Sequence, residues 1–85
     1  MREAILLPGA RAYRALMSEA EQLEVERRIN RLERDASVDN RTTFAIPGTS
    51  ELFLYEDGLW RMTYATPDAA TIVVRSIAHA LDLPN

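Results

Sequence analysis

The stretch that decides the fold is LFLYEDGLWRMTYATPDAATIVVRSIAH, residues 52–79. It contains the chain's clearest hairpin signal, its one tryptophan and its one histidine. The hairpin signal is Asp57-Gly58, a dipeptide that favours the positive φ angles of a type I′ turn. Alternating apolar residues run into this dipeptide and out of it. The sequence therefore predicts two antiparallel strands joined by a two-residue loop.

A two-residue loop also fixes which residues of the two strands face each other. With the dipeptide as the loop, Tyr55 is expected to face Trp60, and Phe53 to face Met62. Because side chains alternate along a strand, these four residues share one face. That face is apolar and aromatic, so we assign it to the core. The opposite face carries Arg61.

A third strand is predicted over residues 70–76, because this run is rich in β-branched residues and follows a turn-rich connection. If Ile72 joins the core face, Arg75 points the other way. If the strand stays extended, Ile77 and His79 share the direction of Arg75. Alternation alone then brings three chemistry-bearing side chains to one side of the sheet: Arg61, Arg75 and His79.

The composition is that of an ordinary globular chain, with 47% hydrophobic and 27% charged residues in 85. We expect a single domain over residues 1–85. The chain has no cysteine and one histidine, which excludes a disulfide framework and a standard metal site. No apolar run approaches the roughly 20 residues of a membrane-spanning helix. These features favour a cytoplasmic protein with no metal, no cofactor and no membrane contact.

The charge is distributed unevenly along the chain. The net charge is −3, and all ten cations are arginines. Residues 1–41 hold eight arginines and eight acids, whereas residues 42–85 hold five acids and only Arg61 and Arg75 as cations. Contacts to phosphate supply most of the affinity for nucleic acids, so an acidic chain is a poor general binder. Any such contact must rest on a local patch.

The N-terminal half predicts a strand and two helices. A strand over residues 3–7 is followed by an alanine-rich helix over residues 10–17. Ser18 begins a capping-box pattern with Glu21, so a second helix is expected to run from there to about Ala36. The stripe that this helix buries against the sheet contains Val25, Ile29 and Leu32.

Arginines recur on the second helix and just beyond it. Arg27, Arg31 and Arg34 form a row, and Arg41 follows in the polar connection. A solvated helix face is the ordinary explanation for such a row, and weak contact with nucleic-acid phosphates is the alternative. Glu24 precedes Arg28 by four residues, which is the favourable order for an ion pair along a helix.

The order of elements predicts the fold class. A strand and two helices come first, and three or four strands follow, beginning with a candidate strand at residues 42–46. This order favours an α+β fold, in which the N-terminal strand and helical hairpin accompany a mainly antiparallel sheet whose helices pack on one face. The other face is then open.

One imidazole near two guanidinium groups is a combination that suits phosphodiester cleavage without a metal. Histidine transfers protons near neutral pH, and arginine neutralises charge that develops on phosphorus. Each residue also has a structural explanation. Arg61 can form a surface ion pair with Glu56, and Arg75 can pair with another acid. His79 can be an incidental residue of a short terminal helix, and Trp60 is expected in the core.

Two segments, LWRMTY at residues 59–64 and IVVRSIAH at residues 72–79, resemble the C-terminal strands of RelE/ParE-superfamily toxins. In those proteins, a strand with an aromatic–arginine pair precedes a β-branched strand that ends in arginine, a few small or apolar residues and histidine. The order of elements is similar too, which implies the RelE-like two-layer fold. The resemblance implies a toxin of a bacterial type II toxin–antitoxin pair, with a cognate antitoxin as a tight partner.

Two activities occur in that superfamily: metal-independent cleavage of mRNA in the ribosomal A site, and poisoning of DNA gyrase. The resemblance implies that Arg61 and Arg75 bind and stabilise phosphate and that His79 is the acid or base. Our leading expectation is a RelE-like ribosome-dependent mRNA endoribonuclease, with the ribosome and mRNA as partners. The alternatives are a ParE-like inhibitor of DNA gyrase and a non-catalytic interaction domain of the same fold.

Overall fold

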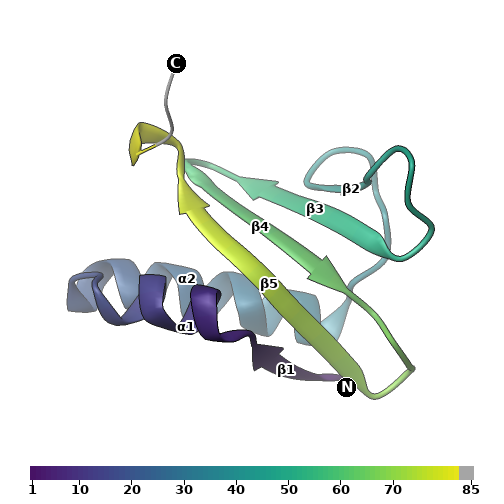
Figure 1. Ribbon diagram of the computed structural model, residues 1–85, viewed down its shortest axis with the longest axis horizontal. Coiled ribbons are helices and arrows are strands. Elements are labelled where there is room, and N and C mark those ends of the chain that lie inside the picture. Colours follow the sequence, from purple (N-terminus) through teal and green to yellow (C-terminus); the bar gives the residue numbers. More distant parts are fainter. Residues whose placement is uncertain (83–85) are drawn as a thin grey trace.

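The computed structural model describes residues 1–82 and shows an α+β fold with two helices and five strands (Figure 1). In chain order the elements are β1 (Glu3–Leu6), α1 (Pro8–Ala15), α2 (Glu19–Arg34), β2 (Thr43–Ala45), β3 (Leu52–Asp57), β4 (Trp60–Ala65), β5 (Thr71–His79) and the short 3₁₀ helix η1 (Ala80–Asp82). The strands form one sheet in the order β1-β5-β4-β3-β2. β1 runs parallel to β5, and the other neighbouring pairs are antiparallel. The predicted α+β class is confirmed.

The first residues of the two helices are set by a proline in α1 and by a capping serine before α2. Pro8 lies in the first turn of α1, where its missing N–H costs no helical hydrogen bond, so α1 begins two residues before the predicted position. The hydroxyl of Ser18 accepts a hydrogen bond from the backbone N–H of Glu21 at 3.2 Å, and the Glu21 carboxylate accepts one from the Ser18 N–H at 3.1 Å. The predicted capping box is confirmed. Neither helix of the described chain is long and apolar enough to span a membrane.

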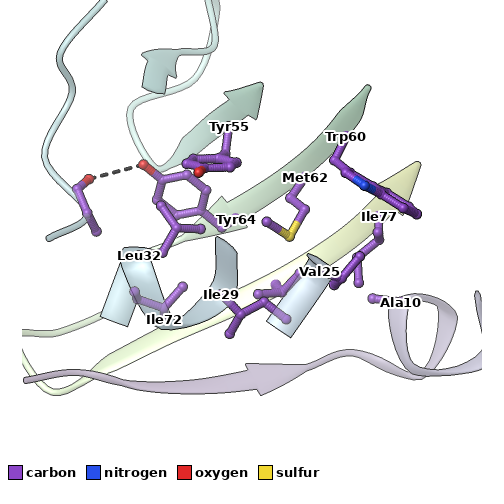
Figure 2. Close-up of a cluster of buried hydrophobic side chains, with 12 residues drawn as sticks. Ala10, Val25, Ile29, Leu32, Tyr55, Trp60, Met62, Tyr64, Ile72 and Ile77 are labelled. Carbon is purple, nitrogen blue, oxygen red and sulfur yellow. Dashed lines mark hydrogen bonds between the residues drawn. The ribbon is translucent and has the colours of Figure 1, made fainter. Parts of the chain in front are cut away.

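The core lies between the helices and one face of the sheet (Figure 2). The stripe on α2 is buried as predicted, and so are the five sheet residues expected against it: Tyr55, Trp60, Met62, Ile72 and Val74. The indole N–H of Trp60 donates a hydrogen bond to a carboxylate oxygen of Glu24 at 2.9 Å. Trp60 is thus a core residue that is tied to α2.

The hairpin register differs from the prediction by two residues. The loop is Gly58-Leu59, so Asp57 faces Trp60 and Tyr55 faces Met62. Only Gly58 of the two loop residues has a positive φ, at 64°, which is the pattern of a type II′ turn and not of type I′. A shift of two residues leaves the alternation unchanged, so the predicted core face of the hairpin is still correct.

Asp57 belongs to the strand because its side chain and backbone are held there. Its carboxylate accepts a hydrogen bond from the Tyr55 hydroxyl at 2.9 Å. The guanidinium of Arg28 donates to the backbone carbonyl of Asp57 at 3.2 Å and lies 3.6 Å from its carboxylate. The ion pair between Glu24 and Arg28 that their spacing favours is absent from the described chain. The Glu24 carboxylate binds Trp60, and the Arg28 guanidinium binds Asp57.

A β-bulge interrupts the pairing of β5 with β4. Thr63 faces Ser76, but the next residue, Tyr64, faces Val74. Arg75 is therefore an extra residue in β5 that has no partner in β4. Val74 is buried on the core face, whereas both Arg75 and Ser76 are exposed.

The bulge shifts the alternation of β5 by one residue. Ile77 was expected on the open face, but it is 5% exposed and belongs to the core. His79 follows the same parity and faces Trp60 across the strand pair. The prediction that His79 shares the direction of Arg75 is therefore wrong, because the strand does not alternate regularly between these two residues.

Candidate functional site

The helices leave one side of the sheet uncovered (Figure 1). Register and alternation place 14 described side chains there, and we call this set the open face. Its members are Glu3, Ile5, Phe44, Leu52, Leu54, Glu56, Arg61, Thr63, Ala65, Thr71, Val73, Arg75, Ser76 and Ala78.

An apolar band crosses the open face. Ile5 faces Val73, Val73 faces Ala65, and Ala65 faces Leu52, so these side chains form one row over four strands. Leu54, in the adjacent row, faces Phe44 on the fifth strand. We call these six residues the apolar band. All of them are at least partly exposed, and Ile5 is 47% exposed.

Arg61 lies on the open face as predicted, and it has a partner. Its Nε is 3.7 Å from a carboxylate oxygen of Glu56, the residue directly opposite in the strand pair. The two side chains are 50% and 41% exposed, so water screens the pair and it adds little stability. The surface ion pair considered from the sequence is present, and the guanidinium stays accessible.

Arg75 is the second arginine of the open face. The bulge leaves it exposed, and no carboxylate of the described chain lies within ion-pairing distance of its guanidinium. Its charge is therefore available to a ligand or a partner. Two exposed guanidinium groups on one face can bind phosphate or carboxylate oxygens.

His79 lies on the other side of the sheet. Its ring meets the indole of Trp60 edge-on, with centroids 4.7 Å apart and planes at 78°. Its Nδ1 accepts a hydrogen bond from the backbone N–H of Leu81 at 3.3 Å, which assigns the proton of the neutral ring to Nε2. The backbone N–H of His79 donates to the hydroxyl of Tyr13 at 3.2 Å. The structure thus brings Arg61 and Arg75 to one face but separates His79 from them.

Arg31, from the predicted nucleic-acid-binding row, is occupied by contacts within the chain. Its guanidinium donates hydrogen bonds to the hydroxyls of Tyr55 and Thr42, each at 3.1 Å, and lies 3.6 Å from the Asp39 carboxylate. It also lies over the Tyr55 ring, 5.5 Å from the centroid. The hydrogen bond with Tyr55 raises the pKa of Arg31 above its usual value. Arg31 therefore joins α2 to the sheet.

The other three arginines of that prediction do remain exposed. Arg27, Arg34 and Arg41 form no ion pair within residues 1–82. Arg27 and Arg34 lie on α2, which packs against the opposite face of the sheet from the open face. Exposed arginines thus lie on both sides of the sheet, Arg61 and Arg75 on the open face and Arg27 and Arg34 on α2.

Asp39 is a structural residue that the sequence reading did not single out. Its carboxylate accepts hydrogen bonds from the backbone N–H groups of Arg41, Thr42 and Thr43 at 2.8, 2.8 and 3.0 Å. These bonds hold the pKa of Asp39 far below its usual value. Asn40, the next residue, has a positive φ of 57°. The signal was the Asp-Asn dipeptide, which favours such turns.

A cavity of about 520 Å³ lies where α2 ends, away from both open-face arginines. Two arginines and two acids are among its lining residues, so their charges balance: Arg2, Arg34, Glu33 and Asp35. The Glu33 carboxylate already accepts a hydrogen bond from the backbone N–H of Ala4 at 2.9 Å. Within the part of the chain that the structure describes, no group of three acidic, histidine or cysteine side chains is placed to hold a metal ion.

The open face thus combines exposed arginine side chains with partly exposed apolar side chains. Arg61 and Arg75 supply its cations, and the apolar band crosses all five strands beside them. Comparisons of the sequence with protein-family models and with curated proteins find no match.

Proposed function

We propose that this chain is the toxin of a bacterial type II toxin–antitoxin pair and acts by binding its target, as ParE-like inhibitors of DNA gyrase do. The resemblance of residues 59–64 and 72–79 to the RelE/ParE superfamily supports the proposal. So does the order of elements, in which a strand and a helical hairpin precede four strands, because this order is similar to the RelE-like two-layer fold. The toxin acts in the cytoplasm.

The observation that favours binding over cleavage is the position of His79. A general acid or base must lie within hydrogen-bonding reach of the proton that it transfers. His79 packs on Trp60 on the covered side, while Arg61 and Arg75 lie on the open face. A gyrase inhibitor requires no proton-transfer group, so the two arginines suffice as contacts to the target.

A RelE-like ribosome-dependent endoribonuclease is the second candidate. The shared face of Arg61 and Arg75 favours it, because two cations on one surface are what stabilisation of a cleaved phosphate requires. On this alternative the partners are the ribosome and mRNA. A non-catalytic interaction domain is the third, and the exposed apolar band is the feature that favours it.

A cognate antitoxin is part of the proposal. In such pairs the antitoxin holds the toxin inactive, so an antitoxin that covers Arg61 and Arg75 would block the surface proposed to bind the target. Expression of the natural operon should therefore give a complex of two polypeptides on size-exclusion chromatography. Elution of this chain alone, with no second polypeptide, would count against the toxin–antitoxin assignment.

The decisive experiment is induced expression in bacteria with two readouts besides growth. One readout is cleavage of a reporter mRNA, and the other is supercoiling of plasmid DNA by gyrase in the presence of the purified protein. We expect growth arrest with inhibited supercoiling and an intact reporter. Arg75→Ala should relieve the arrest, whereas Arg27→Ala, which removes an exposed arginine of α2, should not.

The matched test of histidine chemistry is His79→Asn, because the Asn side-chain oxygen can replace Nδ1 as the acceptor for the Leu81 N–H. A binding toxin should keep its full activity in this variant. Loss of a proton-transfer group costs about 10²- to 10⁴-fold in rate when the group is catalytic. Reporter cleavage by the wild-type chain that disappears in His79→Asn would overturn the binding mode and support the ribonuclease.

A further inference from the structure

We propose that the open face is also a homodimer interface, on which two copies of this chain pack face to face around a two-fold axis. This inference does not depend on the proposed function, because it rests on the apolar band and on the charges beside it. A sheet normally buries both faces when both are apolar, and here the helices cover only one. The other face needs a second layer that the described chain does not supply.

The charges of the open face suit a second copy of the same surface. The face carries two acids and two arginines, namely Glu3, Glu56, Arg61 and Arg75, so its formal charge is zero. The whole chain carries −3. Two copies can therefore approach through this face without the repulsion that their overall charge creates elsewhere. A nucleic acid would instead require a surface with excess positive charge.

Two of these charges are placed so that they complement each other between copies. Glu3 faces Thr71, four positions before Arg75 in β5, and the Ile5–Val73 pair lies between them. Four residues of a strand span about 13 Å, too far for an ion pair within one chain. No ion pair of either side chain is found within residues 1–82. Each copy thus presents an unpaired acid and an unpaired arginine on either side of an apolar pair.

A two-fold axis that lies in the interface and crosses the strands at the Ile5–Val73 pair reverses the strand direction. It places Glu3 of each copy near Arg75 of the other, and the row of Ile5, Val73, Ala65 and Leu52 meets its counterpart between the two ion pairs. This is an isologous contact, the commonest type in soluble oligomers, since each surface patch pairs with itself. The pairing is reciprocal, so one interface contains both ion pairs.

The size of the face sets the expected strength of the dimer. With strands about 4.8 Å apart and a rise of about 3.3 Å per residue, the strands present roughly 450 Å² per copy. Because the axis lies near one end of the face, about half of it overlaps, and two copies bury roughly 500 Å², which is less than stable specific interfaces bury. We therefore expect a weak dimer, with a dissociation constant in the high micromolar range.

Pairing through the edges of the sheet does not compete with this contact. At β1, the backbone N–H groups of Arg2 and Ala4 donate hydrogen bonds to the backbone carbonyl and the carboxylate of Glu33, at 3.0 and 2.9 Å. At β2, the backbone N–H of Thr43 donates to Asp39. Edges that are capped in this way resist strand addition, so self-association is directed to the face.

The test is sedimentation equilibrium of the purified chain over about 10 µM to 2 mM, a range that brackets a high micromolar dissociation constant. Glu3→Arg and Arg75→Glu should each weaken the dimer at least about tenfold, because each places like charges opposite one another. The double variant restores opposite charges, and its dissociation constant should return to within about threefold of wild type. Arg27→Glu makes the same change of charge on α2 and should leave association unchanged.

A wild-type chain that stays monomeric over the whole range would overturn the proposal, and so would a dimer that the charge reversals leave unaffected. Concentration-dependent NMR shifts of the wild-type chain give a second measurement that needs no variant. The shifts should map to the open face, and shifts confined to the exposed side of α2 would contradict the proposal. Binding of an RNA oligonucleotide by the open face in place of a second copy would do so as well.

Discussion

The two faces of this sheet are built from the same five strands, yet they use their side chains in different ways. On the covered face, Tyr55 and Tyr64 are 0% exposed, and both hydroxyls form hydrogen bonds. On the open face, the apolar band is partly exposed, and Arg75 forms no ion pair within the described chain. The covered face therefore provides stability, whereas the open face keeps apolar area and charge available for partners.

The largest expected effect on folding comes from Trp60, which is buried on the covered face beside the hairpin loop. Trp60→Ala removes a side chain that is 2% exposed and deletes its hydrogen bond to Glu24. The free energy of unfolding should fall by about 3–5 kcal/mol, which is most of the stability of so small a domain. Chemical denaturation followed by circular dichroism measures this loss. Leu59→Ala, in the adjacent exposed loop, is the control, and equal losses in both variants would contradict the assignment of the faces.

Tyr64 tests the polar contacts of the covered face. Its hydroxyl donates a buried hydrogen bond to the backbone carbonyl of Ala36 at 3.0 Å (Figure 2). Tyr64→Phe leaves that carbonyl without its partner, so the free energy of unfolding should fall by about 1–3 kcal/mol at neutral pH. A loss no larger than that of an exposed-site substitution would show that water replaces the hydroxyl.

The pH dependence of Tyr64→Phe gives an independent check. Burial raises the pKa of Tyr64 to about 12, above its usual value of 10.0. The folded state thus disfavours the ionised ring, so this stabilising effect is complete below pH 10 and is lost as the pH rises toward 12. Wild-type stability should therefore decrease more steeply between these pH values than that of Tyr64→Phe. Parallel curves for the two proteins would be the contradicting result.

The bulge gives a smaller effect of an unusual kind. Deletion of Arg75 removes the extra residue that β5 carries between Val74 and Ser76, and it leaves Val74, Ser76 and Ile77 on the faces that they already occupy. We expect the fold to survive with a loss of about 1 kcal/mol. Deletion of Leu54 in β3 is the matched control, because no bulge can absorb it and the side chains beyond it reverse their faces. Unfolding of both deletion variants would show that the bulge is required.

The covered face was predictable from the sequence because burial imposes a regular pattern. Alternation placed Tyr55, Trp60 and Met62 correctly even though the register of the hairpin was wrong by two residues. The capping box at Ser18 was equally clear, since it depends on two residues only three positions apart. Local and periodic patterns in the sequence were thus enough to predict which side chains lie between the helices and the sheet.

The candidate site was harder to predict, because it depends on how two strands align. One extra residue in β5 moves His79 to the other face. A prediction from strict alternation assumes that no such bulge is present. The sequence does contain a signal: Arg75-Ser76 is a pair of polar neighbours between Val74 and Ile77, which breaks the alternation. Arg31 shows the same limit, since its partners Tyr55 and Asp39 lie far from it in the chain.

The most direct comparison of the two faces comes from one substitution at two neighbouring positions, and its open-face member has the smallest expected effect. Val73 is partly exposed on the open face, and Val74 is 0% exposed on the covered face. Threonine has nearly the shape of valine and a similar preference for strands, so Val→Thr changes little except the burial of a hydroxyl. Val74→Thr should lower the free energy of unfolding by about 1–3 kcal/mol, because its hydroxyl enters an apolar core.

Val73→Thr should change the free energy of unfolding by less than about 0.5 kcal/mol, because water reaches the new hydroxyl. Both variants are compared at a protein concentration below the dissociation constant expected for the dimer, so that only folding is measured. Fluorescence of Trp60 during urea denaturation follows the transition, since the ring is buried in the folded chain. A loss at Val73 as large as that at Val74 would mean that the open face is covered even in the monomer. Its apolar band would then be part of the core and not a surface for partners.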